Sequence, residues 1–66
     1  MCRSIKVLRR PAEPATNEEI AAASLQFVRK ISGFPKPSKA NREAFEKAVA
    51  EVGAASERFL RSVGAL

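Results

Sequence analysis

The second half of the chain repeats apolar or small side chains at alternating spacings of four and three residues. The repeat passes through Phe45, Val49, Val52, Ser56, Phe59 and Val63, and Ala48, Ala55 and Leu60 widen the same side. Because an α-helix turns once in about 3.6 residues, these positions lie on one side of a single helix. The pattern predicts a long helix over residues 39–63, with an apolar side that needs a partner to cover it.

A first helix is predicted over residues 17–32. Thr16 and Glu19 have the spacing of a capping box, in which the threonine hydroxyl accepts a hydrogen bond from the Glu19 amide and the glutamate side chain accepts one from the Thr16 amide. Gly33 follows the last residue of this helix and can adopt the left-handed conformation that ends many helices. Local signals therefore predict both the start and the end of the helix.

The two predicted helices are separated by a short segment that contains Pro35 and Pro37. Proline lacks the backbone N–H of a helix interior, so neither helix can continue through it, and Ser38 is the expected N-cap of the second helix. A connection this short turns the chain back on itself. We therefore expect an all-α fold, an antiparallel hairpin of two helices formed by residues 16–66 and preceded by an N-terminal arm of residues 1–15.

The first helix carries more apolar surface than one packing partner can cover. One stripe consists of Ile20, Ala23, Phe27 and Ile31, and an adjacent stripe consists of Ala21, Leu25 and Val28. Together they span roughly 200° of the helix surface, which exceeds the apolar stripe of an ordinary surface helix. One stripe can pack on the second helix. The other then faces either the arm or another subunit, and the second option is a homodimer in which two hairpins form a four-helix bundle.

The length of 66 residues favours oligomerisation as a source of stability. A chain of this size buries only about 60% of the surface that its unfolded form exposes, so its core is marginal. The one cysteine, Cys2, cannot form a disulfide within the chain, and the lack of histidine argues against a structural zinc site. We expect no metal, no cofactor and a homodimer, with a monomer that docks its own arm as the alternative.

The distribution of apolar residues argues against a membrane protein. No apolar run approaches the roughly 18 residues that a membrane-spanning helix needs. The first ten residues carry four basic side chains but lack the apolar segment of a signal peptide. We expect a cytoplasmic protein whose single thiol stays reduced.

Basic side chains gather around the expected turn. The chain has a formal net charge of +5. Five cations with no acidic residue among them lie where the two helices meet: Arg29, Lys30, Lys36, Lys39 and Arg42. Arg3 from the arm can join them. Such a cluster can bind a protein partner or the phosphates of nucleic acid, although a surplus of this size also serves solubility alone. We expect a protein partner at this end, with nucleic acid as the alternative.

Residues that carry catalysis in enzymes are sparse in this chain. The glutamates are explained by the helix start and by the polar side of the second helix, and the three glycines are isolated rather than gathered in a phosphate-binding loop. With no histidine to serve as a base, we expect Cys2 to be a small side chain that anchors the arm. A reactive or metal-ligating thiol next to Arg3 is the alternative. The sequence therefore favours a non-enzymatic protein.

The opening Met-Cys-Arg-Ser-Ile stands out together with the segments 14–20, 25–34, 36–41 and 44–45. As a set they resemble a family of short, uncharacterised bacterial proteins known as a domain of unknown function, in which Asn usually stands at the place of Ser4. The resemblance covers nearly the whole chain and implies no established activity. We therefore expect a small helical protein-interaction module, with a nucleic-acid-associated protein as the alternative.

Overall fold

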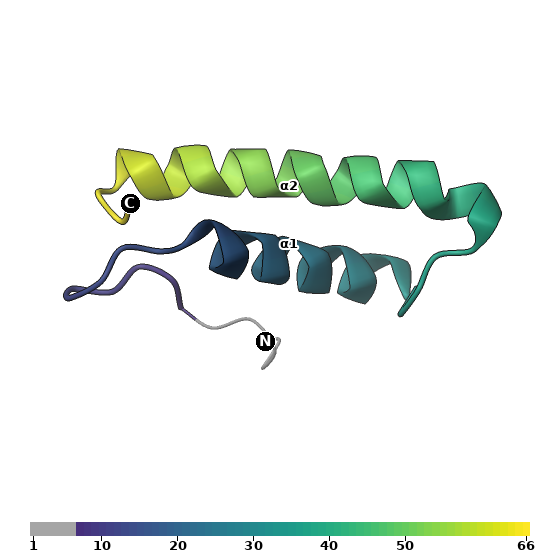
Figure 1. The fold of residues 1–66 in the computed structure, drawn as a ribbon, viewed down its shortest axis with the longest axis horizontal. Helices are drawn as coiled ribbons and strands as arrows, with labels where there is room; N and C mark the ends of the chain where they lie inside the picture. Colours follow the sequence, from purple (N-terminus) through teal and green to yellow (C-terminus); the bar gives the residue numbers. More distant parts are fainter. Residues whose placement is uncertain (1–6) are drawn as a thin grey trace.

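The computed structural model describes residues 7–66 and contains two long helices. Helix α1 spans Asn17–Ser32 and helix α2 spans Arg42–Ser62, with the 3-10 helix η1 (Lys39–Asn41) directly before α2. The two α-helices run antiparallel and pack side by side, and no strand occurs within residues 7–66 (Figure 1). The predicted all-α fold of two packed helices is confirmed.

Local hydrogen bonds set both ends of α1. The Glu19 backbone N–H donates to Thr16 Oγ1 over 3.1 Å, and the Thr16 N–H donates to Glu19 Oε1 over 3.0 Å, so the predicted capping box is present. At the other end Gly33 is left-handed, with a φ of 73°, and its N–H donates to the Arg29 carbonyl over 2.9 Å. These bonds satisfy backbone groups that a helix end otherwise leaves without partners.

The second helix begins differently from the prediction. Ser38 precedes η1, but its hydroxyl accepts no backbone N–H; it accepts the side-chain amide Nδ2 of Asn41 over 3.2 Å. The chain then makes one short 3-10 turn, and the α-helix starts at Arg42. Ser38 is thus the N-cap residue of the 3-10 turn, whereas the N-cap residue of α2 is Asn41, so the predicted cap position is wrong for α2 itself, and the Ser38 hydroxyl makes no capping bond to the backbone. The helix ends at Ser62, two residues before Gly64, which has a φ of 76°.

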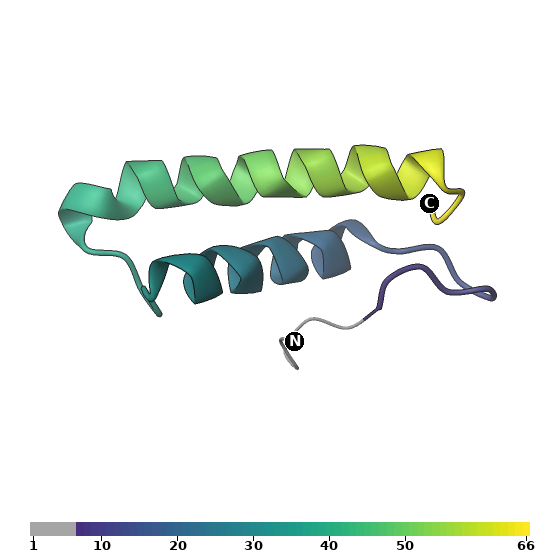
Figure 2. The ribbon, with the colours of Figure 1, turned by 180° about the vertical axis from the view of Figure 1, so that it is seen from behind.

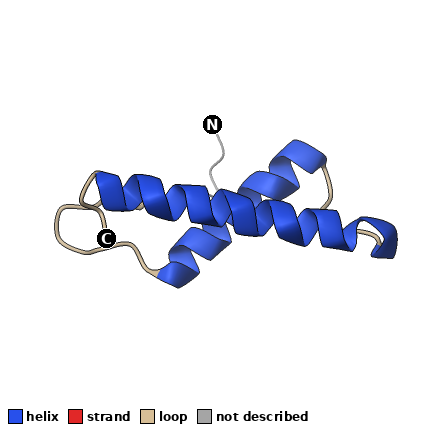
Figure 3. Ribbon diagram, turned by 90° about the horizontal axis from the view of Figure 1, so that it is seen from above, coloured by secondary structure: helices blue, strands red, loops and turns tan. Residues whose placement is uncertain are grey.

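The two helices approach each other closely at Ser24 and Gly53. A Cβ atom added to Gly53 would lie 3.4 Å from Ser24 Oγ. Ser24 is only 2% exposed, and its hydroxyl donates to the Ile20 carbonyl over 2.7 Å, so this buried polar group is satisfied. Seen from above, α1 crosses α2 at a marked angle (Figure 3). Two small residues at this point let the helix backbones come together.

The packed side of α1 runs between the two apolar stripes of the sequence. Its buried residues are Ile20, Ser24 and Val28, which combine one member of each stripe with a serine that belongs to neither. Phe27 and Ile31, of the first stripe, stay 44% and 68% exposed. The expectation that one whole stripe packs on the second helix is therefore wrong, because the contact follows the serine that permits the close approach.

The packed side of α2 differs between its two ends. Phe45 is buried near the turn. Near the end of the helix Leu60, at the edge of the predicted apolar side, is buried, whereas Phe59 and Val63 of the repeat are 64% and 45% exposed. Because α1 crosses α2 at an angle, the line of contact shifts around α2 from one end to the other (Figure 3). Part of the predicted apolar side is therefore left uncovered.

Residues 7–16 close the end of the hairpin that lies opposite the turn (Figure 2). The Ala15 N–H donates to the Ala65 carbonyl over 2.9 Å. Leu8 packs against a buried cluster that consists of Ala15, Ile20, Leu60 and Ala65. These contacts hold the segment before α1 against the segment after α2.

Candidate binding cleft at the turn of the hairpin

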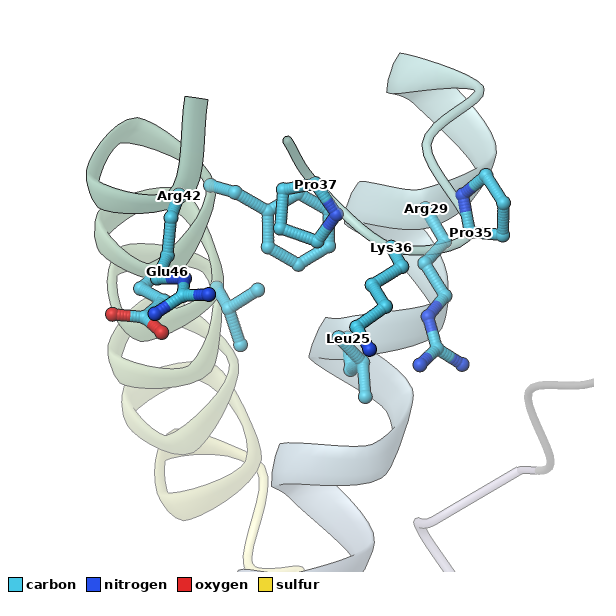
Figure 4. Close-up of a pocket in the computed structure, with 9 residues that line it drawn as sticks. Leu25, Arg29, Pro35, Lys36, Pro37, Arg42 and Glu46 are labelled. Atoms are coloured by element: carbon cyan, nitrogen blue, oxygen red, sulfur yellow. The ribbon is translucent and has the colours of Figure 1, made fainter. Parts of the chain in front are cut away.

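An open cleft, here called the turn cleft, lies between the last turns of α1, the connecting segment and the first turns of α2 (Figure 4). Its volume is about 370 Å³. It is lined by Leu25, Arg29, Pro35, Lys36, Pro37, Arg42, Phe45, Glu46 and Val49. Most of these side chains are apolar and all but one of the charged ones are cationic. The turn cleft therefore combines an apolar lining with positive charge.

Local interactions fix the connecting segment that forms one wall of the turn cleft. Ser32 Oγ donates to the Val28 carbonyl over 2.7 Å and accepts the Phe34 N–H over 3.1 Å. Beyond this point Pro35 and Pro37 restrict the backbone, because the proline ring fixes φ. The wall is thus preorganised, and the lysine between the two prolines is held at the edge of the cleft.

The three cations of the turn cleft come from three different parts of the hairpin. Arg29 belongs to α1, Lys36 to the connecting segment and Arg42 to the first turn of α2. Figure 4 shows Arg29 and Lys36 near each other on one wall, while Arg42 lies on the other wall beside a glutamate. Nε of Arg29 is buried and has no hydrogen-bond partner within the described residues. The terminal nitrogens of a cleft-lining guanidinium are donors that suit an acidic ligand.

The remaining site residues predicted from the sequence do not join this group. Lys30 and Lys39 are exposed at the same end of the hairpin, but neither lines the turn cleft. Arg3 and Cys2 lie outside the described residues 7–66, so the partner-binding role of Arg3 and the anchoring or reactive role of Cys2 stay predictions. Of the predicted basic cluster, only Arg29, Lys36 and Arg42 line the turn cleft.

Sequence reasoning missed the apolar lining of the turn cleft. Periodicity explains Leu25, Phe45 and Val49 as packing residues, yet all three also line the cleft, and only Phe45 is classed as buried. A signal was present in Pro35 and Pro37, because two prolines in a short connection form a rigid wall rather than a mobile loop. Such a wall can leave apolar side chains of the flanking helices accessible.

The opposite side of the hairpin carries an uncovered apolar surface, here called the apolar face. Phe27 precedes the buried Val28 and Arg29 follows it, so Phe27 and Arg29 point to opposite sides of α1. The large exposed side chains of the apolar face are Phe27, Ile31, Phe59 and Val63. Of these four, Phe27 borders a hollow of about 300 Å³ that is lined by Ala23, Ser24, Phe27, Val52 and Ser56. Ser56 Oγ donates to the Val52 carbonyl over 2.7 Å, so this hydroxyl is satisfied within its own helix.

A group of charged residues joins the N-terminal segment to α1 at the closed end. Arg10 donates through Nη1 and Nη2 to the two carboxylate oxygens of Glu19, each over 2.9 Å, and to the Pro14 carbonyl over 3.0 Å. The hydrogen bond to Glu19 raises the pKa of Arg10 above its ordinary value. Because Glu19 also belongs to the capping box, its carboxylate connects the segment before α1 to the helix start.

The charged groups of the turn cleft are three cations and one carboxylate. No group of three histidine, cysteine or acidic side chains within residues 7–66 is placed to hold a metal ion. No helix in that part of the chain is long and apolar enough to cross a membrane. The fold and the cleft define a small, basic α-helical hairpin with an open cleft at its turn.

Comparison with known proteins identifies the family of this hairpin. The chain belongs to the family described as "Uncharacterized conserved protein (DUF2277)", whose model matches residues 1–65. No curated protein and no solved structure matches the chain. The resemblance to an uncharacterised family is thereby confirmed, and the function must be argued from the surfaces of the hairpin.

Proposed function

We propose that this protein is a small, non-enzymatic interaction module that works as a homodimer and binds a partner protein at the turn cleft. The uncovered apolar face is the observation that carries the proposal. Phe27 and Ile31 of α1 and Phe59 and Val63 of α2 are 44%, 68%, 64% and 45% exposed, and their helical spacing puts each pair on one side of its own helix. Gathered apolar side chains of this kind mark interaction surfaces, whereas single exposed ones are ordinary.

A second copy of the chain suits the apolar face in shape and size. The hollow includes the small residues Ala23, Ser24 and Ser56, and the exposed ring of Phe59 belongs to the same face. In a two-fold dimer each Phe59 can enter the hollow of the other copy, because every contact of such an interface occurs twice. The molecule measures 41 Å by 21 Å along its two longer axes, so one side of it is large enough to contain an interface that buries roughly 800 Å² on each partner.

Two hairpins joined through this face form a four-helix bundle and leave both turn clefts open on the outside. In this arrangement residues 16–66 are the bundle-forming unit and residues 1–15 are an arm. A monomer whose arm covers the apolar face is the alternative. The proposal places the protein in the cytoplasm, where the thiol of Cys2 stays reduced.

Sedimentation equilibrium at micromolar concentration tests the dimer. The chain has a mass of 7.2 kDa, and we expect the wild type to sediment at twice that value. Phe59→Glu places a charge in the interface and should give the monomer. Ala54→Glu is the matched control, because it adds the same charge at an exposed position on a different side of α2 and should leave the dimer intact.

A wild type that sediments as a monomer contradicts the proposal, and so does a Phe59→Glu variant that stays dimeric. Circular dichroism of each variant shows whether the helices are retained. A helical monomer for Phe59→Glu together with a helical dimer for Ala54→Glu is the result that the proposal expects.

Binding of nucleic acid is the second candidate function. Five cations at the turn end favour it: Arg29, Lys30, Lys36, Lys39 and Arg42. We rank a protein partner first because the turn cleft is mostly apolar, and phosphates gain nothing from an apolar lining. Affinity that comes from neutralising several phosphates falls steeply with salt. A mobility shift of DNA or RNA at low salt that disappears at higher salt would favour this candidate, and no shift at low salt would remove it.

A further inference from the structure

We propose that the turn cleft binds a short acidic segment of a partner protein, which inserts one large apolar side chain between the two helices. This inference rests on the proposed function only in placing partner recognition at the turn, and it does not require a dimer. Its basis is a juxtaposition: apolar side chains from both helices line the same cleft as Arg29 and Lys36, and neither of these cations forms an ion pair within residues 7–66.

The apolar part of the cleft is the first argument for a peptide. Leu25 from α1 and Val49 from α2 line it from both helices, and Phe45 with the two prolines lines it at the turn. A leucine or phenylalanine side chain inserted there is transferred from water to an apolar environment, which favours binding. A sugar-phosphate backbone gains no binding free energy from such a lining. A volume of about 370 Å³ lies near the lower end of ligand pockets and accommodates one anchoring side chain with its neighbours.

The charges of the cleft are the second argument. The single carboxylate of the lining, Glu46, lies beside Arg42 on the α2 wall (Figure 4). Arg29 and Lys36 lie on the other wall, away from that carboxylate. Arg29 lines the cleft and forms no ion pair within the described residues, so the terminal nitrogens of its guanidinium can donate to a carboxylate of a ligand. Acidic residues next to the apolar anchor would therefore meet Arg29 and Lys36.

The rigidity of the connecting segment is the third argument. The Ser32 hydroxyl donates a hydrogen bond to the Val28 carbonyl and accepts one from the Phe34 N–H. Two prolines follow in the connecting segment. A wall that is ordered before the partner arrives costs little entropy on binding. The cleft can thus act as a fixed receptor for a flexible segment.

Fluorescence anisotropy with the full chain tests the inference directly. The probe is a labelled peptide in which glutamate and aspartate flank a leucine–phenylalanine pair. One control peptide carries lysine in place of the acidic residues, and a second carries glycine in place of the apolar pair. A labelled single-stranded DNA oligonucleotide is the third comparison. At physiological salt we expect the acidic, apolar peptide to bind, and each of the three comparisons to bind at least about tenfold more weakly.

Single-charge variants locate the binding site. Arg29→Gln and Lys36→Gln should each weaken binding of the peptide by roughly threefold to tenfold, because each removes a cation of the cleft. Lys30→Gln is the matched control, since it removes the same charge next to Arg29 at an exposed position outside the lining. It should change the affinity by less than about twofold. Lys36 lies in the exposed turn, so its variant keeps the test valid if Arg29→Gln fails to fold.

The inference is wrong if the acidic, apolar peptide does not bind, or if either control peptide binds as tightly. It is also wrong if Lys30→Gln weakens binding as much as Arg29→Gln, or if the oligonucleotide binds more tightly than the peptide. Phe59→Glu separates this test from the dimer. If the Phe59→Glu variant is monomeric and keeps its affinity for the peptide, peptide binding at the turn cleft is supported independently of the dimer. If the wild type is dimeric but does not bind the peptide, the proposed peptide binding is wrong and the dimer is not affected.

Discussion

Ser24 and Gly53 determine how closely the two helices pack, and neither residue stands out in the sequence. A serine counts as polar in a hydrophobicity pattern, and an isolated glycine inside a helical pattern is a weak signal. Their role appears only when the antiparallel pairing brings Gly53 within contact distance of Ser24. The buried line of α1 could therefore not be predicted from its own periodicity, because it depends on a residue of the other helix.

Gly53→Ala should stabilise the protein by up to about 1 kcal/mol, because alanine is the better helix former. Its Cβ would meet Ser24 Oγ at 3.4 Å, which is an ordinary contact. Gly53→Leu should destabilise instead, since the larger side chain must push α1 away. Urea unfolding at a fixed protein concentration measures both variants. A stabilising effect of leucine would show that the helices do not approach closely here.

Gly33→Ala should destabilise the protein, whereas Gly53→Ala should stabilise it. Gly33 has a φ of 73°, and an added Cβ would meet no atom within 4 Å, so only the backbone conformation opposes the substitution. The left-handed conformation costs a residue with a side chain about 1–2 kcal/mol. The same urea titration should show this loss. An unchanged stability would mean that α1 does not end in a left-handed residue.

Arg10→Gln should loosen the N-terminal segment while the hairpin stays folded, because it removes the ion pair to Glu19. Hydrogen exchange of the Ala15 amide, which is bonded to Ala65, should accelerate. Arg9→Gln removes the same charge from an exposed neighbour and should leave that exchange unchanged.

The same ion pair has a predictable pH dependence on the arginine side. The pKa of Arg10 is raised by its hydrogen bond to Glu19. A group whose folded pKa is raised stabilises the fold at every pH below its unfolded pKa, and this contribution is lost only as pH rises through the raised value. The protection of the Ala15 amide should therefore not decline between neutral and moderately alkaline pH once intrinsic exchange is corrected for.

At the scale of the elements, the two helix starts behave differently although both carry a hydroxyl residue. Thr16→Ala should cost about 1 kcal/mol, because the Thr16 hydroxyl accepts the Glu19 N–H. Ser38→Ala should change stability by less than about 0.5 kcal/mol, because the Ser38 hydroxyl bonds only the exposed Asn41 side chain. Thermal unfolding of both variants compares them. Equal losses of stability in the two variants would show that the Ser38 side chain caps the second helix.

The ends of the helices were more predictable than their relative orientation. A capping box and a left-handed glycine act within a few residues, so the sequence alone predicts both ends of α1. Which of two neighbouring residues, Phe59 or Leu60, turns inward depends on the crossing of the helices and not on α2 itself. Periodicity therefore predicts that an apolar side exists, but not how much of it the partner helix covers.

At the scale of the whole molecule, the hairpin has two sides with different chemistry. One side carries the turn cleft with its cations, and the other carries the apolar face. The sequence predicts the cations around the turn, including Arg29, Lys36 and Arg42, because they are close together along the chain. It does not predict the cleft, because its lining comes from α1, the connecting segment and α2 at once.

In the proposed dimer a second copy of the chain packs on the apolar face. An isotope-filtered NOE experiment on a mixture of labelled and unlabelled protein detects only contacts between subunits, and so reports on this packing. We predict NOEs from the ring of Phe59 in one copy to Ala23 and Phe27 in the other. NOEs between subunits that involve Leu25 and Val49 instead, or none at all at concentrations where sedimentation shows a dimer, would contradict the proposed packing.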